Sequence, residues 1–375
     1  MAMFDYRIIK GVFTRELFEI YFLLGMKRFA ITMVGLFLPL YIYHELGYSF
    51  NQTIYFFLMF ILFFTIFLYP AVKLVGWKGA KHSMILSIPI IFLGLLFGIL
   101  LQDNPLLFYP TAAFLGMEAV FFWIGFHIDA AVQGKKRKTG KEAGIINFVN
   151  IFPDIIGPLL GGLILFYFSF TVLFILALVI VLISVIPMLF SKEVYTKTDF
   201  DLKYFFKENH LKYFFAFFAQ GIRGMTFAVF WPLFIFTILG NYISLGIYGS
   251  FATIFVCIFA LLLGDYSDKS RRGFLIKISA LFDGIFWVFK IFITSVIQIF
   301  ALGTLGGIAF MGISVPLLSK TYDRAKKEKV AGFILFRELA IMSGQFTVLF
   351  AVLFVGKLEL SFALTAVTSL LYLFF

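Results

Sequence analysis

The stretch Gly157-Pro158-Leu159-Leu160-Gly161-Gly162 lies in an apolar run from Ile145 to Phe168, whose one charged residue is Asp154. Helices in water tolerate such a stretch poorly, because proline removes a backbone hydrogen bond and glycine adds chain entropy. In a bilayer, glycines let a neighbouring helix approach closely, and neighbouring groups satisfy the carbonyl that proline frees. The stretch therefore predicts a membrane helix packed tightly against others.

The composition places the whole chain in the membrane. Of its 375 residues, 62% are hydrophobic and 14% charged, and the mean hydropathy is +1.02. Soluble domains are about 45–50% apolar and about 25% charged, so a water-soluble class is excluded. We attribute the 56 Phe residues to lipid-facing positions rather than to an aromatic pocket. The single cysteine, Cys257, excludes an intrachain disulfide.

Twelve apolar runs are long enough to span a bilayer. We place them at residues 29–45, 53–72, 82–101, 106–128, 145–168, 170–190, 213–239, 243–263, 275–294, 299–318, 332–355 and 359–375. Only Thr294, Ser295 and Gln298 mark the division between the ninth and the tenth. Residues 12–25 predict an interfacial helix leading into the first span. We expect no cleaved secretory signal, because residues 1–28 are mixed and charged.

The basic residues predict the orientation. The 31 Lys and Arg residues fall in alternate connections, apart from Arg223, Lys290, Arg337 and Lys357. Connections rich in Lys and Arg stay in the cytoplasm. Both termini are therefore predicted to be cytoplasmic in a multi-pass protein of the cytoplasmic membrane. The net charge of +11 reflects this topology and gives no reason to expect nucleic-acid binding.

The longest charged connection predicts two halves. It follows the sixth span and gives an N-terminal six-helix bundle at 1–191, a linker at 192–212 and a C-terminal bundle at 213–375. A weak repeat supports the division: Asp129, a basic loop and Ala143-Gly144 in the first half correspond to Asp323, a basic loop and Ala331-Gly332 in the second. The predicted fold class is an all-α polytopic membrane protein, with twelve helices in two pseudo-symmetric bundles.

Two stretches of the sequence resemble conserved motifs of the major facilitator superfamily of transporters. Gly157 to Gly162 is similar to the Gly-Pro-x-x-Gly-Gly signature on its fifth helix, which is commonest in exporters. The segment from Gly264 to Arg272 is similar to its loop motif Gly-x-x-x-Asp-Arg-x-Gly-Arg-Arg. The matching residues are Gly264, Asp268, Lys269 and Arg272, while Arg271 replaces the second glycine.

The resemblance implies that this loop is a gate, with Asp323 as the partner of its arginines and Asp129 at the matching end of the first half. A positive-inside anchor would explain the basic residues but not Gly264 and Asp268. The resemblance also has gaps. The equivalent first-half loop has Gly76 in place of the aspartate, and the fourth span has Glu118 instead of the arginine of drug and proton antiporters.

Ionisable residues inside the spans are the candidate site, because each is costly in lipid unless paired or hydrated. Glu118, Asp154 and Arg223 lie near mid-span on spans four, five and seven, which line the central cavity in the superfamily. Asn150 shares a helix face with Asp154, and Gln220 shares one with Arg223. We predict that Asp154 or Glu118 approaches Arg223, either as a proton-switched pair or as a static bridge between the halves.

Other membrane charges receive weaker assignments. Arg337 and Glu338 fit gating and binding equally well. We assign Asp283 and Lys290 a structural role, because the ninth span is peripheral in the superfamily. We give His127 a packing or interfacial role, because it faces away from Glu118 on the helix.

The functional prediction is a secondary transporter that exports a small organic solute in exchange for protons. An uptake symporter or uniporter is the alternative within transport, and a membrane enzyme or lipid-handling scaffold is the alternative class. The sequence has no metal-ligand spacing, phosphate-binding loop or catalytic triad. We therefore expect no enzyme activity, no cofactor and no metal, and a monomer whose partners are solute, protons and lipid.

Overall fold

The computed structural model describes residues 15–133, 140–190, 210–266 and 272–375, with the backbone alone at 15–21, 133, 140–151, 190 and 260–266. The described residues form helices and no strands. The first half contains α2 (Arg15–Gly35), α3 (Leu38–Leu40), η1 (Tyr41–Glu45), α4 (Phe50–Lys78), α5 (Ala80–Leu100), η2 (Pro105–Leu107), α6 (Phe108–Gln133), α7 (Gly140–Tyr167), α8 (Phe170–Val185) and η3 (Ile186–Phe190). The second half contains α9 (Leu211–Met225), η6 (Thr226–Phe230), α10 (Trp231–Leu239), α11 (Tyr242–Tyr266), α12 (Arg272–Lys290), α13 (Val296–Lys327), α14 (Val330–Val355), α15 (Glu359–Ser369) and η7 (Leu370–Phe374).

These elements join into consecutive membrane-length rods, which confirms the predicted all-α fold. Within the described residues, 9 helices are long and apolar enough to cross a membrane, and Phe152–Tyr167 and Glu359–Phe374 are shorter apolar helices. The first rod of each half is interrupted near a proline. Leu38-Pro39-Leu40 follows the break in the first, and Trp231-Pro232-Leu233 follows a π-helical turn in the second.

The division between the ninth and tenth spans is confirmed. Ser295 caps α13 by accepting from the Gln298 backbone N–H, and the Gln298 side chain accepts from the Ser295 N–H. Of the predicted interfacial helix at 12–25, residues 12–14 lie outside the described residues, and from Arg15 the chain continues as one helix to Gly35. Lys27 and Arg28 therefore lie inside the first rod.

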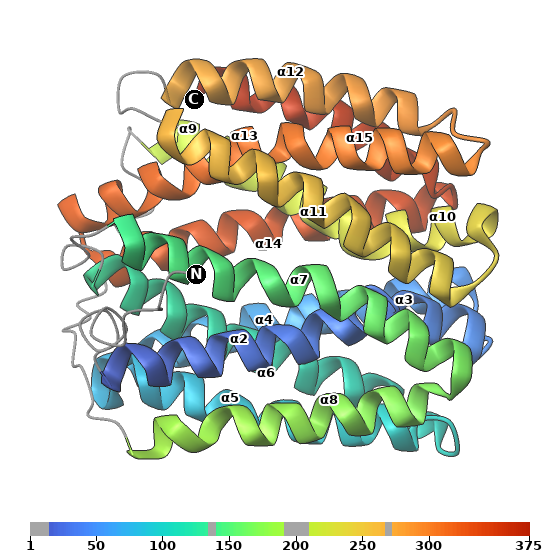
Figure 1. Ribbon diagram of the computed structural model, residues 1–375, viewed down its shortest axis with the longest axis horizontal. Coiled ribbons are helices and arrows are strands. Elements are labelled where there is room, and N and C mark those ends of the chain that lie inside the picture. Colours follow the sequence, from blue (N-terminus) through green and yellow to red (C-terminus); the bar gives the residue numbers. More distant parts are fainter. Residues whose placement is uncertain (1–14, 134–139, 191–209, 267–271) are drawn as a thin grey trace, which may run out of the picture.

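Helix contacts repeat between the two halves. In the first half α2 packs on α7, α5 on α6 and α5 on α8; in the second, α9 packs on α14, α12 on α13 and α12 on α15. Contacts of α7 with α11 and of α4 with α14 join the halves. Figure 1 shows the first half below and the second above, with the helices roughly parallel. The predicted linker at 192–212 lies almost wholly outside the described residues, so its limits stay a prediction.

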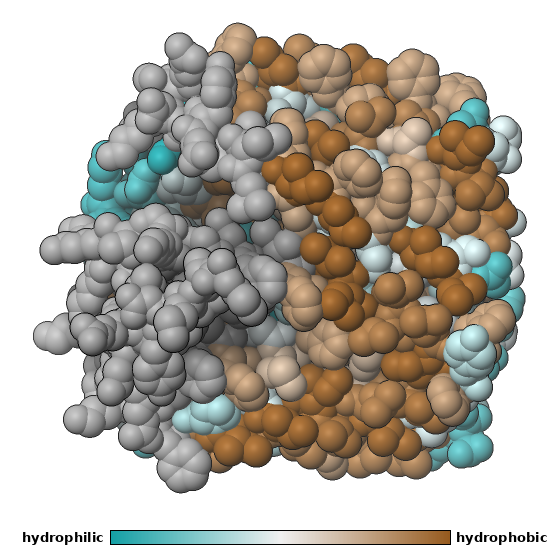
Figure 2. Space-filling model, viewed as in Figure 1, coloured by the Kyte–Doolittle hydropathy of each residue, from teal (hydrophilic) through white to brown (hydrophobic). Residues whose placement is uncertain are grey.

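The outer surface suits lipid. Large apolar side chains lie exposed on it, including Phe354 at 84% and Ile297 at 81%. Figure 2 shows hydrophobic residues covering most of the described part of the visible face, with hydrophilic residues at its right edge and at its upper left. So much contiguous apolar exposure is not found on monomeric soluble proteins. We call the right edge in Figure 1 the distal end, and the left edge, where α13 connects to α14, the basic end.

Candidate transport site

The glycine stretch lies where three helices meet. A Cβ atom added at Gly157 would lie 2.2 Å from Thr32 Oγ1, and one at Gly161 would lie 2.3 Å from the Met33 carbonyl oxygen, both on α2. Gly162 faces the other half instead, because a Cβ there would lie 2.7 Å from the Tyr242 carbonyl oxygen on α11. Beside Pro158, the Leu159 N–H donates to Ser250 Oγ of α11 over 3.1 Å. The stretch thus packs α7 against its own half and against the other half.

A buried ion pair lies inside the first half. Lys27 of α2 contacts the Glu118 carboxylate of α6, and only 1% and 6% of the two side chains are exposed. The Lys27 ammonium also donates to Ser87 Oγ of α5 over 3.2 Å and lies 3.1 Å from the centroid of the Phe122 ring. Glu118, Ser87 and Phe122 therefore favour the charge of the ammonium, by ion pairing, hydrogen bonding and cation–π attraction respectively.

A cavity of about 220 Å³ adjoins this ion pair. Apart from the pair, its walls are almost entirely apolar, and all of them come from the first half: α2, α3, η1, α4, α5, α6 and α8. Ile31 and Gly35 line it and are exposed, so the cavity reaches the molecular surface. The cavity therefore combines apolar walls with one buried carboxylate.

A second ion pair links α2 to α7. Arg28 donates to the two Asp154 carboxylate oxygens over 2.7 and 2.5 Å. Their side chains are 35% and 25% exposed, so this pair is less enclosed by the protein than the first. Asn150 lies one turn before Asp154 on α7, where only the backbone is described.

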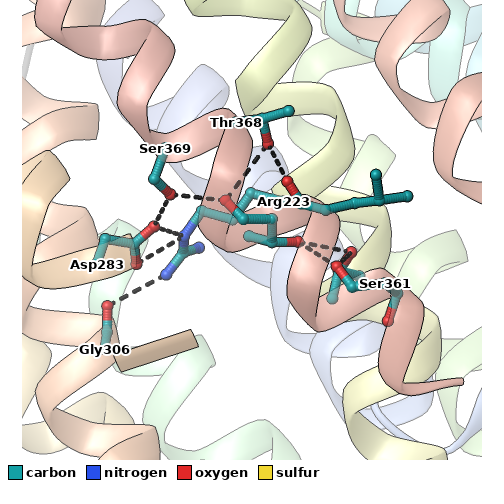
Figure 3. Close-up of polar contacts among 9 residues, drawn as sticks. Arg223, Asp283, Gly306, Ser361, Thr368 and Ser369 are labelled. Carbon is teal, nitrogen blue, oxygen red and sulfur yellow. Dashed lines mark hydrogen bonds and ion pairs between the residues drawn. The ribbon is translucent and has the colours of Figure 1, made fainter. Parts of the chain in front are cut away.

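The second half has its own buried cluster (Figure 3). Arg223 of α9 donates to Asp283 of α12 over 3.1 Å and to the Gly306 carbonyl of α13 over 3.2 Å. Ser369 of α15 donates to Asp283 over 3.0 Å. The guanidinium lies 3.5 Å from the centroid of the Phe310 ring. Arg223 and Asp283 together thus tie four helices.

Lys290 adds a second cation to this cluster. Its ammonium lies 3.8 Å from the centroid of the Trp287 ring and 4.6 Å from that of Trp231. Among the described residues it has aromatic neighbours but no hydrogen-bond acceptor. It also approaches Gly306, where an added Cβ would lie 3.0 Å from Nζ.

The observed ion pairs differ from the predicted ones. In this structure neither Glu118 nor Asp154 contacts Arg223, because each carboxylate is taken by a cation from α2. Arg223 pairs instead with Asp283, for which the sequence predicts a structural role. Gln220 is half-buried one turn before Arg223, and Arg337 and Glu338 pair with each other inside α14.

Sequence reasoning missed Lys27 and Arg28, because it placed them in a cytoplasmic segment ahead of the first span. The available signal was their setting: apolar residues occupy 22–25 immediately before Met26 and 29–34 after Arg28, apart from Thr32. Two adjacent cations within such a run point about 100° apart on a membrane helix, so they can meet different neighbouring helices. The positive-inside rule counts such residues as topology markers. It does not test whether they form ion pairs with carboxylates on other helices.

Histidine–tyrosine contacts join the halves at both ends. At the distal end, His44 Nδ1 lies 3.2 Å from the Tyr242 hydroxyl, which donates to Glu45 Oε2 over 3.3 Å. At the basic end, His127 Nδ1 lies 2.8 Å from the Tyr322 hydroxyl. The packing role assigned to His127 thus omitted a polar contact between the halves.

The proposed gate is only partly described. Gly264 lies near the end of α11, while Asp268 and Lys269 fall outside the described residues. Arg272 donates to Asp323 over 3.0 Å, the partner named from the sequence. Asp129 is buried near the end of α6. Just beyond α13, burial raises the pKa of Glu328, which accepts from His210 over 3.1 Å.

The described residues contain no group of three or more His, Cys, Asp or Glu side chains placed to hold a metal ion. Cys257 is buried and not disulfide-bonded. The chemistry available at the candidate site is therefore that of charged pairs, hydrogen bonds and an apolar cavity.

Comparison with known proteins gives the family. The fold is similar to a crystal structure of a major facilitator superfamily transporter, FucP, in the outward conformation, with a TM-score of 0.67 and 14% sequence identity. That match covers 95% of this chain and 96% of FucP, and at this identity it concerns the fold alone. A search of curated proteins gives no match. The sequence model of the Major Facilitator Superfamily matches residues 20–347, and the chain therefore belongs to the major facilitator superfamily of secondary transporters.

Proposed function

We propose that this protein exports a small organic solute across the cytoplasmic membrane in exchange for protons, as a monomer with both termini in the cytoplasm and without enzymatic activity. The observation that carries the proposal is the Lys27–Glu118 pair beside the apolar cavity of the first half. A buried carboxylate with a single lysine as its partner can either stay ionised and pair with that lysine or take up a proton. Export follows from the likeness of Gly157 to Gly162 to the exporter signature.

In the proposed cycle, protonation of Glu118 shifts the equilibrium between two conformational states of the transporter. A proton on Glu118 removes its negative charge and leaves Lys27 with Ser87 and Phe122 alone. An unpaired cation in a buried site is costly, so protonation favours a state in which Lys27 is hydrated. Asp154 and Arg28 form a second pair that a proton can open, at the seam between α2 and α7.

The two ends supply the gates of alternating access. The contacts of His44 with Tyr242 and of His127 with Tyr322 both join the halves, so each must open when the halves separate at its end. The Gly157–Gly162 stretch is the pivot in this scheme, because small residues let α7 move against both neighbours without steric obstruction. Arg272, Asp323 and the segment around Asp268 form the remainder of the basic-end gate.

The test measures proton movement in liposomes containing the purified protein and a trapped pH-sensitive dye. Solutes are first screened by thermal shift, because a ligand that binds only the folded protein raises its melting temperature. With a stabilising solute outside and a pH gradient imposed, wild type should exchange solute for protons. Glu118→Gln should lose at least tenfold of the pH-driven flux and keep solute counterflow.

A matched variant separates the two candidate acids. Asp154→Asn removes the more exposed carboxylate and should reduce pH-driven flux less than Glu118→Gln. If both variants keep full pH-driven flux, neither acid couples protons, and a uniporter becomes the better description. For orientation, cysteines at Lys138 and Asn241 in a Cys257→Ala background should react with an impermeant thiol reagent from opposite sides.

A further inference from the structure

Among the described residues, the cavity of the first half is lined by few polar side chains, and one of them, Glu118, keeps an unsatisfied acceptor. Tyr41 and Thr111 line it, but their hydroxyls already donate to the carbonyls of Gly98 and Leu107 over 2.5 and 2.7 Å. Glu118 differs, because its Oε1 contacts Lys27 as an ion pair but is buried without a hydrogen-bond partner among the described residues. A carboxylate can accept about four hydrogen bonds, so Glu118 retains capacity for another donor.

The size of the cavity limits what can supply that donor. An apolar cavity of about 150 Å³ in another protein holds benzene. At about 220 Å³ this cavity has room for one ring with a substituent. Pockets for drug-sized ligands are larger, at roughly 300–1,000 Å³.

Charge limits the ligand further. Lys27 and Glu118 carry opposite charges in contact, so the site is neutral before a ligand enters. A charged ligand would bring an unpaired charge among apolar walls, which is costly. A neutral hydroxyl or N–H group adds a hydrogen bond without that cost.

We propose that the first-half cavity binds a small, uncharged, mainly apolar molecule whose single hydroxyl or N–H group donates a hydrogen bond to Glu118. This site lies within one six-helix half rather than between the halves. The ligand is the transported solute only if the proposed function holds. In that case, a proton on Glu118 removes the negative charge that strengthens the ligand's hydrogen bond, so protonation and ligand binding oppose each other, as an exchange of solute for protons requires.

The experiment titrates the purified protein in detergent with phenol and with toluene, by calorimetry, after subtraction of empty-micelle blanks. The two probes have the same ring and similar size, but only phenol donates a hydrogen bond. Wild type should bind phenol at least tenfold more tightly than toluene. In the double variant Lys27→Met with Glu118→Leu, which removes both charges together, the two affinities should become equal.

A second pair of variants tests the location. Ala119→Phe fills the cavity and should abolish binding of both probes, whereas Ala130→Phe, on the same helix but outside the lining, should bind as wild type does. Equal binding of phenol and toluene to wild type, or unchanged binding to Ala119→Phe, would overturn the proposal. If the probes bind as expected but the liposomes show no pH-driven flux, proton-coupled transport is contradicted. The proposed binding site would still be supported.

Discussion

The buried cation clusters of the two halves use the same framework and differ in one respect. In each half the cation comes from the first rod and meets the third and fourth: Lys27 with Ser87 and Glu118, Arg223 with Asp283 and Gly306. Each cation also lies over a phenyl ring one turn after its contact on the fourth rod, Phe122 after Glu118 and Phe310 after Gly306. The carboxylate lies on the fourth rod in the first half and on the third in the second.

The difference lies in what surrounds each carboxylate. Asp283 has Arg223 and Ser369 as donors, and its side chain is 0% exposed. Glu118 contacts one lysine and faces a cavity. A carboxylate enclosed by donors holds helices together, whereas one that faces an open volume can exchange a partner. We therefore propose a structural role for the second cluster and a functional role for the first.

The largest effect should come from the enclosed carboxylate. Asp283→Leu leaves Arg223 and Lys290 without an anion, and breaking a buried pair costs about 3–5 kcal/mol. We expect no monodisperse peak in size-exclusion chromatography of the solubilised variant. Asp323→Leu, whose side chain is 56% exposed in the wild type, serves as control and should elute normally. A folded Asp283→Leu with wild-type melting temperature would remove the distinction between the clusters.

The packing of α7 should be the next most sensitive feature. Gly161→Leu would push a side chain into the Met33 carbonyl and separate α7 from α2, so we expect loss of transport and a lower melting temperature. Leu160→Phe, at the half-buried neighbouring position, should transport nearly as wild type does. The check is liposome flux for both variants at equal protein content. Normal flux in Gly161→Leu would show that the close approach is dispensable.

A smaller substitution tests how tightly the side chains of the second cluster are packed. Gly306→Ala places a Cβ 3.0 Å from the Lys290 ammonium nitrogen, and overpacking costs typically about 1–3 kcal/mol. We expect a melting temperature several degrees below that of wild type. Gly273→Ala is the control, because its nearest neighbour would be 3.7 Å away and alanine favours helix. An equal rise in melting temperature in both variants would mean that the side chains of the second cluster can move to make room for the added methyl group.

The smallest effect on stability should come from the exposed pair. Arg28 and Asp154 are less enclosed than Arg223 and Asp283, so the loss of this pair should cost less stability. Asp154→Asn should therefore leave the melting temperature within a degree or two of wild type. A large fall in melting temperature would mean that the Arg28–Asp154 pair stabilises the fold as the enclosed cluster of the second half does.

The sequence alone determined the membrane class, the all-α fold and the family. These follow from summed, local quantities: apolar run length, the spacing of basic loops and a short glycine-proline motif. Ser295 and Gln298 marked the division between two spans, because a capping box is a local pattern. The same sequence placed Glu118, Asp154 and Arg223 within apolar spans, and in the structure each lies in an apolar helix.

The partner of each buried charge was decided only by the tertiary structure. Glu118 pairs with Lys27, 91 positions away, and Arg223 with Asp283, 60 positions away. Such pairs depend on how each helix is rotated and how far it is shifted along its axis, and packing across several helices sets both. A rotation of one residue on a helix, about 100°, turns a side chain from one neighbour to another. Periodicity gives the face of a residue within its own helix, but the facing helix is known only once all the rods have packed together.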